Sequence, residues 1–313
     1  MTRVAAVDCG TNSIRLLVAD VDPATCQVVD LDRRMEIVRL GEGVDRTGRI
    51  APEAMRRTLE AARRYADVAR SLGAQRVRFV ATSASRDAEN AAEFVAGVRA
   101  VLGVDPEVVT GDEEAALSYT GATAGLHGEH EAPFLVVDLG GGSTELVLGD
   151  GSVHAAVSVD VGCVRMTERH LHSDPPTPAE VDAATGDVRA ALDRAADVVA
   201  LARARTLVGL AGSVTTVTAH ALGLDAYRPE RIHRSTLPVA DVVAACDDLL
   251  HMPRDKRAAL PYMHPGRVDV IGAGALVWRL VVERVAADAG IAEVVTSEHD
   301  ILDGIALSVA VGR

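Results

Sequence analysis

The chain has 313 residues, enough for two domains of ordinary size or one large domain. Its hydrophobic content of 48% excludes a disordered or collagen-like chain, and no apolar run approaches the roughly 18 residues that a membrane helix requires. Lysine and arginine number 32 and aspartate and glutamate 45, giving a net charge of −13. This charge argues against a general nucleic-acid binder, because such proteins present a basic face to phosphates.

Lysine and cysteine usage excludes further classes of protein. The single lysine, Lys256, is not in a Gly-Lys-Ser/Thr sequence, which excludes a Walker A loop and disfavours Schiff-base chemistry. The N-terminus runs Met-Thr-Arg-Val-Ala-Ala-Val-Asp8, which puts a charge where a signal peptide would need its apolar core, so we expect a cytoplasmic protein. The cysteines form no Cys-x-x-Cys pair and are expected to be reduced thiols: Cys9, Cys26, Cys163 and Cys246.

The first predicted element is a hairpin that recurs later in the chain. Residues 6–18 consist of an apolar strand, a turn of the pattern Asp-x-Gly-x-x-Ser, and a second apolar strand. Residues 136–148 repeat this pattern at an offset of 130 residues. The repeat predicts two copies of one structural unit. The matching positions are Asp8 and Asp138, Gly10 and Gly140, Ser13 and Ser143, and Leu16 and Leu146.

Each turn has the composition of a phosphate-binding loop. Glycine lets the backbone approach a ligand closely, successive N–H groups can form an anion-binding concavity, and the serine hydroxyl adds a donor. The aspartate would act on phosphate through a divalent cation or a positioned water. The expected substrate-binding residues of the turns are Thr11, Asn12, Ser13, Gly140, Gly141, Gly142, Ser143 and Thr144.

The segments after each hairpin predict alternating strands and helices. After the first hairpin we expect strand 26–40, helix 52–72, strand 76–81, helix 87–102, strand 107–110 and a helix from about Asp112. After the second we expect strand 153–159, helices around 178–202, strand 206–210 and a helix after Gly212. This alternation predicts an α/β protein with mixed, largely parallel sheets covered by helices, and a ligand at the strand ends.

Four segments together resemble the exopolyphosphatase/guanosine pentaphosphate phosphatase family. They are Asp8-Cys-Gly-Thr-Asn-Ser-Ile-Arg15, Ala81-Thr-Ser-Ala-Ser-Arg-Asp-Ala88, Gly111-Asp-Glu-Glu-Ala115 and Val137-Asp-Leu-Gly-Gly-Gly-Ser-Thr-Glu145. The family belongs to the actin-like, sugar-kinase and Hsp70 superfamily. The resemblance implies two duplicated actin-like (ribonuclease H-like) domains with a cleft between them. We expect these domains at 1–128 and 129–313, with room for the last helix to pack back on the first.

The resemblance also implies roles for the carboxylates. Glu114 is the expected catalytic base that accepts a proton from the attacking water. Taken without the resemblance, Glu113 and Glu114 are also ordinary first-turn glutamates that favour the helix dipole. Asp138 and Glu145 are expected to take part in catalysis. Together with Asp8 they are also expected to bind Mg²⁺ or Mn²⁺, directly or through water.

Three arginines are candidate phosphate ligands. Arg15 occupies the position that Glu145 fills in the second copy. The first copy therefore carries a guanidinium group, which can donate several hydrogen bonds to phosphate, where the second carries a carboxylate. Arg86 lies between a predicted strand and a predicted helix, where an anion-binding arginine would reach a ligand. Arg267 lies where the family places an arginine before a long helix.

The expected function is metal-dependent hydrolysis of terminal phosphate from inorganic polyphosphate, and the resemblance implies a homodimer. We expect short chains to be favoured, because larger family members carry extra C-terminal helical domains and a charge of −13 offers no basic track for a long polyanion. The alternatives are a guanosine pentaphosphate (pppGpp) phosphohydrolase and a non-catalytic phosphate or nucleotide sensor. Leu210 stands where relatives often have threonine in the nucleoside segment, which weakens the first alternative, and Leu302 replaces an arginine common in the closing motif.

Overall fold

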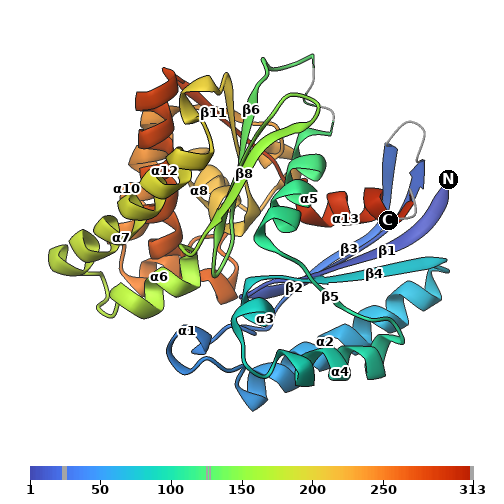
Figure 1. Ribbon diagram of the computed structural model, residues 1–313. Helices are drawn as coiled ribbons and strands as arrows, with labels where there is room; N and C mark the ends of the chain where they lie inside the picture. The colour runs from blue at the N-terminus through green and yellow to red at the C-terminus, as the bar shows by residue number, and fades with distance from the viewer. Residues whose placement is uncertain (23–26, 125, 127, 311–313) are drawn as a thin grey trace. The chain divides into compact units, whose positions relative to one another are not determined.

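The computed structural model describes residues 1–22, 27–124, 126 and 128–310, which form two compact units (Figure 1). The first unit comprises Met1–Ala124 and the segment that starts at Asp300, and the second is Gly125–His299. The C-terminal segment joins the core of the first unit, which the predicted division into 1–128 and 129–313 allowed for the last helix. No helix among the described residues is long and apolar enough to cross a membrane.

The first unit is built on a five-stranded sheet of order β3-β2-β1-β4-β5. Its strands are β1 (Thr2–Cys9), β2 (Ser13–Asp22), β3 (Gln27–Ile37), β4 (Arg76–Ala81) and β5 (Glu107–Val108). The pairs β1–β2 and β2–β3 are antiparallel, whereas β4 runs parallel to β1 and β5 parallel to β4. Strands β1, β4 and β5 therefore end at one edge of the sheet, where the following turns meet.

Helices cover both faces of this sheet, which is why β1 is apolar along almost its whole length. Alternate residues point to opposite faces, so Ala5 and Val7 pack in one cluster with Tyr65, and Val4 and Ala6 in another with the C-terminal helix. The helices of the unit are α1 (Val44–Thr47), α2 (Pro52–Ser71), α3 (Ser83–Asp87), α4 (Ala91–Leu102), α5 (Gly111–Thr123) and α13 (Ile301–Ala310).

The second unit contains a six-stranded sheet of order β10-β11-β9-β6-β7-β8. Its strands are β6 (Phe134–Leu139), β7 (Thr144–Gly149), β8 (Val153–Val159), β9 (Thr206–Leu210), β10 (Thr236–Pro238) and β11 (Glu293–Thr296). The order β8-β7-β6-β9-β11 and its pairing directions repeat those of β3-β2-β1-β4-β5, with β10 added at the edge. The predicted duplicated α/β fold is therefore confirmed.

The second unit has the larger set of helices. They are α6 (Cys163–His170), α7 (Pro178–Val198), the 3-10 turn η1 (Leu201–Arg203), α8 (Ala211–Ala221), α9 (Pro229–Ile232), α10 (Val239–His251), α11 (Arg254–Ala258), the 3-10 turn η2 (Pro265–Arg267) and α12 (Ile271–Ala289). Trp278 on α12 is buried in the core of the unit with residues of β6 and β9.

The predicted elements differ from the structure mainly where a distant contact intervenes. Strands 76–81, 153–159 and 206–210 are confirmed with the predicted bounds. The predicted helix 87–102 begins only at Ala91 as α4, after a separate short helix α3 that ends at Asp87. Between the two, the side chain of Asn90 is bonded to the backbone of Ile50 at 2.9 and 3.1 Å. The predicted segment 178–202 is α7 followed by η1, and Cys26, the expected start of the third strand, lies outside the described residues.

Two glycines let α5 and α13 pack at very short range. A Cβ atom on Gly121 of α5 would lie 1.9 Å from the carbonyl oxygen of Asp300, and one on Gly304 of α13 would lie 2.0 Å from that of Leu117. This close approach places Leu302 and Ile305 of α13 in the cluster that covers β1. The place of α13 in the first unit thus depends on two positions that tolerate no side chain.

We therefore expect Gly304→Ala to lower the free energy of unfolding by about 3 kcal/mol, because the added methyl group must displace α13 from α5. Gly186→Ala on the exposed side of α7 is the control, since a Cβ there meets nothing within 4 Å. It should stabilise the protein by roughly 0.5–1 kcal/mol through helix propensity. Chemical denaturation measures both, and equal effects of the two variants would contradict the tight crossing.

Candidate functional site

The turn of the first hairpin is fixed by its backbone carbonyls. Gly10 N donates to Ser13 O at 2.9 Å and closes the turn. The carbonyl of Thr11 accepts from Gly41 N at 2.8 Å, and that of Asn12 accepts from Val38 N at 3.0 Å and Arg39 N at 2.9 Å. Because a trans peptide group is planar, each bonded carbonyl directs the next N–H the opposite way. The amides of Asn12 and Ser13 therefore point away from segment 38–41.

Arg15 lies between two buried carboxylates. It faces Asp8 across the β1–β2 ladder, and its Nε and Nη2 donate to Oδ2 of Asp8 at 3.0 and 2.7 Å. Its Nη1 donates to Oδ2 of Asp300. Asp8 and Asp300 are 5% and 4% exposed. Burial raises the pKa of Asp8, and the positive charge of Arg15 acts in the opposite direction. The charge of Arg15, a predicted phosphate ligand, is thus already balanced within the protein.

Arg86 and Glu114 are brought together after β4 and β5, at the edge where β1 also ends. Nη1 of Arg86 on α3 donates to Oε2 of Glu114 on α5 at 3.1 Å and to the carbonyl of Val109 at 3.1 Å. Glu114 is 8% exposed. The neighbouring Glu113 accepts from Arg78 at 3.0 Å, so the two glutamates of the motif have different partners. The structure thus separates the predicted base from its neighbour.

The turn of the second hairpin is closed by the same backbone bond as the first, but the carbonyls that bind a neighbouring segment lie one position earlier. Gly140 N donates to Ser143 O at 3.0 Å. The carbonyls of Gly140 and Gly141 accept from Cys163 N at 3.0 Å and Val164 N at 2.8 Å, at the start of α6. The amides of Gly141 and Gly142 therefore point away from α6. This packing requires a glycine at 162, where a Cβ would lie 2.4 Å from Gly141 O.

Carboxylates face each other across the second hairpin. Asp138 and Glu145 are paired in the β6–β7 ladder and are 7% and 1% exposed. Ser158 Oγ donates to Oε1 of Glu145 at 2.6 Å, which fixes that carboxylate. Thr144, a predicted substrate ligand, donates its hydroxyl to the carbonyl of Val161 and is fully buried, so it holds the hairpin in place.

Arg267 lies beside the turn between β9 and α8. Its Nη1 donates to Thr216 Oγ1 at 3.2 Å, its guanidinium lies 6.0 Å from the ring centre of Tyr227, and a Cβ on Gly212 would lie 2.5 Å from its Cζ. Leu210, which precedes this turn, is in register with Asp138 in the parallel β6–β9 pair. Arg267 is thus on the same sheet edge of the second unit as the second hairpin.

Sequence reasoning missed two polar partners of the site. Asp300 is not among the predicted site residues, although an aspartate directly before an apolar helix is a recognisable N-cap signal. Ser83 lies with its Oγ 2.8 Å from Thr11 Oγ1, a contact between distant segments that no local pattern reveals. Leu302, by contrast, is a core residue of the first unit.

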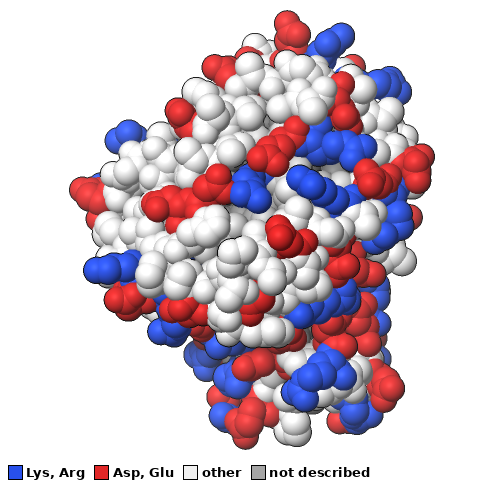
Figure 2. Space-filling view, turned by 90° about the vertical axis from the view of Figure 1, so that its left-hand side faces the viewer, with Lys and Arg blue, Asp and Glu red and all other residues white. Residues whose placement is uncertain are grey.

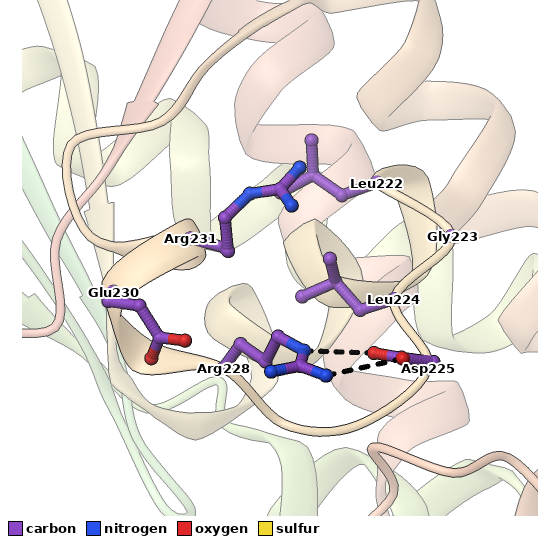
Figure 3. A pocket seen from close by; sticks show the side chains of 7 residues that line it. All are labelled: Leu222, Gly223, Leu224, Asp225, Arg228, Glu230 and Arg231. Atoms are coloured by element: carbon purple, nitrogen blue, oxygen red, sulfur yellow. Dashed lines mark hydrogen bonds and ion pairs between the residues drawn. The ribbon is translucent and has the colours of Figure 1, made fainter.

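A hollow of about 410 Å³ lies elsewhere, after the end of α8 (Figure 3). Arg228 is paired with Asp225 there, at 2.9 and 3.2 Å. None of the predicted site residues lines this hollow, and it takes no part in the site described above. Its lining residues are Leu222, Gly223, Leu224, Asp225, Arg228, Glu230 and Arg231.

A family model described as the Ppx/GppA phosphatase family matches residues 17–309. The chain belongs to this family. Exopolyphosphatase 2 of Mycobacterium tuberculosis is 54% identical over 99% of each chain. A bifunctional 3-dehydroquinate synthase/phosphatase of Fusobacterium nucleatum is 29% identical over 97% of this chain and 46% of its own length. The predicted family is therefore confirmed.

Solved structures share the fold of this member of the Ppx/GppA family. An exopolyphosphatase-like protein superposes with a TM-score of 0.94 at 46% identity, covering 98% of this chain and 97% of that chain. The Aquifex aeolicus PPX-GPPA enzyme superposes with a TM-score of 0.80 at 29% identity, covering 98% and 99%. The α/β fold with two sheets is thus that of the family.

We expect Arg15→Met to destabilise the protein by about 3 kcal/mol at neutral pH, because it leaves Asp8 and Asp300 as buried carboxylates without their shared cation. The pKa of Asp8, already raised by burial, should rise further. A raised pKa in the folded protein means that protonated Asp8 favours folding. This contribution to the free energy of unfolding is fully present below the unfolded carboxyl pKa of about 3.9 and is lost as the pH rises through the folded pKa. Denaturation at pH 5 and pH 7 should therefore show a smaller loss at pH 5, and equal losses would contradict the ion-pair assignment.

Proposed function

We propose that the chain hydrolyses the terminal phosphoanhydride bond of inorganic polyphosphate and releases orthophosphate. The observation that carries this proposal is the pairing of Glu114 with Arg86 at the sheet edge where the first hairpin also turns. Membership of a phosphatase family and 54% identity to a protein named exopolyphosphatase support the choice of reaction and substrate.

Glu114 is the proposed base. Phosphoryl transfer to water needs a positioned nucleophile and stabilised charge on the transferred group, and it needs little covalent chemistry from the protein. A carboxylate that Arg86 holds at 3.1 Å keeps one orientation, so it can accept the proton of a water aligned with the scissile bond. Arg86 then has two tasks, because it fixes Glu114 and places positive charge near the phosphoryl oxygens.

The two turns are the proposed phosphate ligands. Amides of Asn12 and Ser13 in the first unit, and of Gly141 and Gly142 in the second, point away from the segments that bind the preceding carbonyls. Fixed amide dipoles of this kind stabilise negative charge without reorganising during the reaction. Ser143 and Arg267 add donors on the second unit, whereas Thr11 and Thr144 already bond within the protein.

A divalent cation fits the second hairpin better than the first. Asp138 and Glu145 offer carboxylate oxygens on adjacent strands, and Mg²⁺ is commonly held by one or two carboxylates with water and substrate phosphates. Asp8 is engaged by the guanidinium of Arg15, which makes it the poorer ligand. The described residues contain no cluster of three or more His, Cys, Asp or Glu side chains that could hold a metal ion. Bound Mg²⁺ or Mn²⁺ would supply charge neutralisation for the substrate.

The preference for short chains follows from the surface charge. Figure 2 shows acidic and basic side chains interspersed over one face, where a long polyanion would require a continuous basic field. The net charge of −13 acts against long polyanions in the same way. A cytoplasmic location and a homodimer are part of the same proposal.

Glu114→Gln should lower the rate of orthophosphate release from tripolyphosphate in Mg²⁺ at least 100-fold, because the amide cannot accept a proton. Glu113→Gln is the matched control on the adjacent residue, and it should retain most of the activity because Glu113 pairs with Arg78. If both variants keep wild-type rates, Glu114 is not the base. If wild-type protein cleaves pppGpp but no polyphosphate, the substrate assignment fails.

The kcat/KM for tripolyphosphate should exceed that for chains of several hundred units, compared per chain end. Raising the salt concentration should weaken activity on both substrates to a similar degree, because the same few donors contact each of them. A measured preference for long chains, with a steep salt dependence confined to them, would reveal an extended binding surface and contradict the proposal.

A further inference from the structure

Asp300 is tied firmly to the helix that follows it. Its Oδ1 accepts from Leu302 N at 3.0 Å, and Oδ2 of Asp303 accepts from Asp300 N at 3.1 Å. This reciprocal arrangement satisfies backbone donors at the start of α13, as an N-cap with its partner three residues on commonly does. The carboxylate of Asp300 therefore has little freedom of its own.

The second oxygen of Asp300 reaches the first hairpin. Its Oδ2 accepts from Nη1 of Arg15, while Nε and Nη2 of Arg15 bind Asp8. Asp8 and Arg15 are register partners on the two strands that flank the turn 10–12. One guanidinium thus joins the start of α13 to both strands of the hairpin.

Helix α13, which follows Asp300, is tightly packed against its neighbours. Its Gly304 packs against Leu117 of α5, and its Ile305 lies in the core that covers β1. A second ion pair, from Arg33 of β3 to Asp303 at 2.6 and 3.2 Å, ties the same helix turn to the far strand of the sheet. Asp300 is consequently held in place before it contacts Arg15.

We propose that Asp300 is a positioning residue that fixes the first hairpin through Arg15. Two carboxylates flank one guanidinium, so the charge of Arg15 orients Asp8 and the turn. The backbone amides of the turn then bind the phosphate. The effect on catalysis rests on the proposed function, since Asp300 itself contacts no substrate. The positioning role is a property of the fold and has its own readout.

The test uses Asp300→Asn, which keeps a side-chain oxygen for the N-cap but removes the charge that Arg15 binds. Arg33→Met is the matched control, because it removes the other ion pair of α13 without touching the hairpin. Arg15→Met and the double variant Asp300→Asn/Arg15→Met complete a double-mutant cycle. The cycle shows whether Asp300→Asn acts through Arg15 or independently of it.

Two experiments are made on the full chain: steady-state kinetics with tripolyphosphate, which give KM and kcat, and hydrogen exchange of the peptide containing residues 10–13. We expect Asp300→Asn to raise KM about tenfold, to change kcat less than threefold, and to speed exchange of the turn at least fivefold. In the Arg15→Met background Asp300→Asn should add nothing to KM or to the exchange rate, and Arg33→Met should change neither.

An effect of Asp300→Asn that is undiminished in the Arg15→Met background would overturn the proposal, as would wild-type exchange in Asp300→Asn. If wild-type protein releases no phosphate from any polyphosphate, the proposed function fails. The exchange rates then decide the positioning role by themselves, because they require no turnover.

Discussion

Hydrogen-bonded carbonyls and planar peptide groups together fix the direction of the backbone amides in both hairpin turns. The carbonyls of Thr11 and Asn12 bind segment 38–41, those of Gly140 and Gly141 bind the start of α6, and each bond sets the direction of the next amide. A ligand site made of backbone donors works only if the turn is rigid before the ligand arrives. Glycine at 41 and at 162 makes this possible, since a Cβ there would lie 2.2 Å from Cγ2 of Thr11 or 2.4 Å from the carbonyl of Gly141.

The two hairpins differ in the charge of one side chain, the one that pairs with the aspartate across the strand ladder. Across from its aspartate the first hairpin has Arg15 and the second has Glu145. The first arrangement is internally compensated and rigid, because Asp8 and Asp300 share one guanidinium. The second brings two carboxylates together, and such a pair suits a cation. The two copies of the duplicated unit therefore differ in charge at this one matching position.

Local patterns predict the parts of this protein that local forces determine. The hairpins and β4, β8 and β9 follow from apolar periodicity and an internal repeat, and Glu114 followed from the family resemblance of its motif. The break at Asn90 coincides with a bond to Ile50, and the return of α13 to the first unit depends on Gly304 meeting Leu117. The bond between Arg15 and Asp300 joins residues 285 positions apart, so no sequence window contains it. The prediction that Arg15 binds phosphate directly did not take this contact into account. The structure shows that its guanidinium is already bonded to Asp8 and Asp300.

The claim that fixed backbone amides of both turns hold the phosphates is tested most directly by amide NMR of the Glu114→Gln variant during titration with tripolyphosphate and Mg²⁺. The account predicts saturable shifts and slowed exchange at Asn12, Ser13, Gly141 and Gly142, with smaller changes elsewhere. Saturable binding that leaves these four amides unchanged, or that shifts instead the residues around the hollow at 222–231, would contradict it.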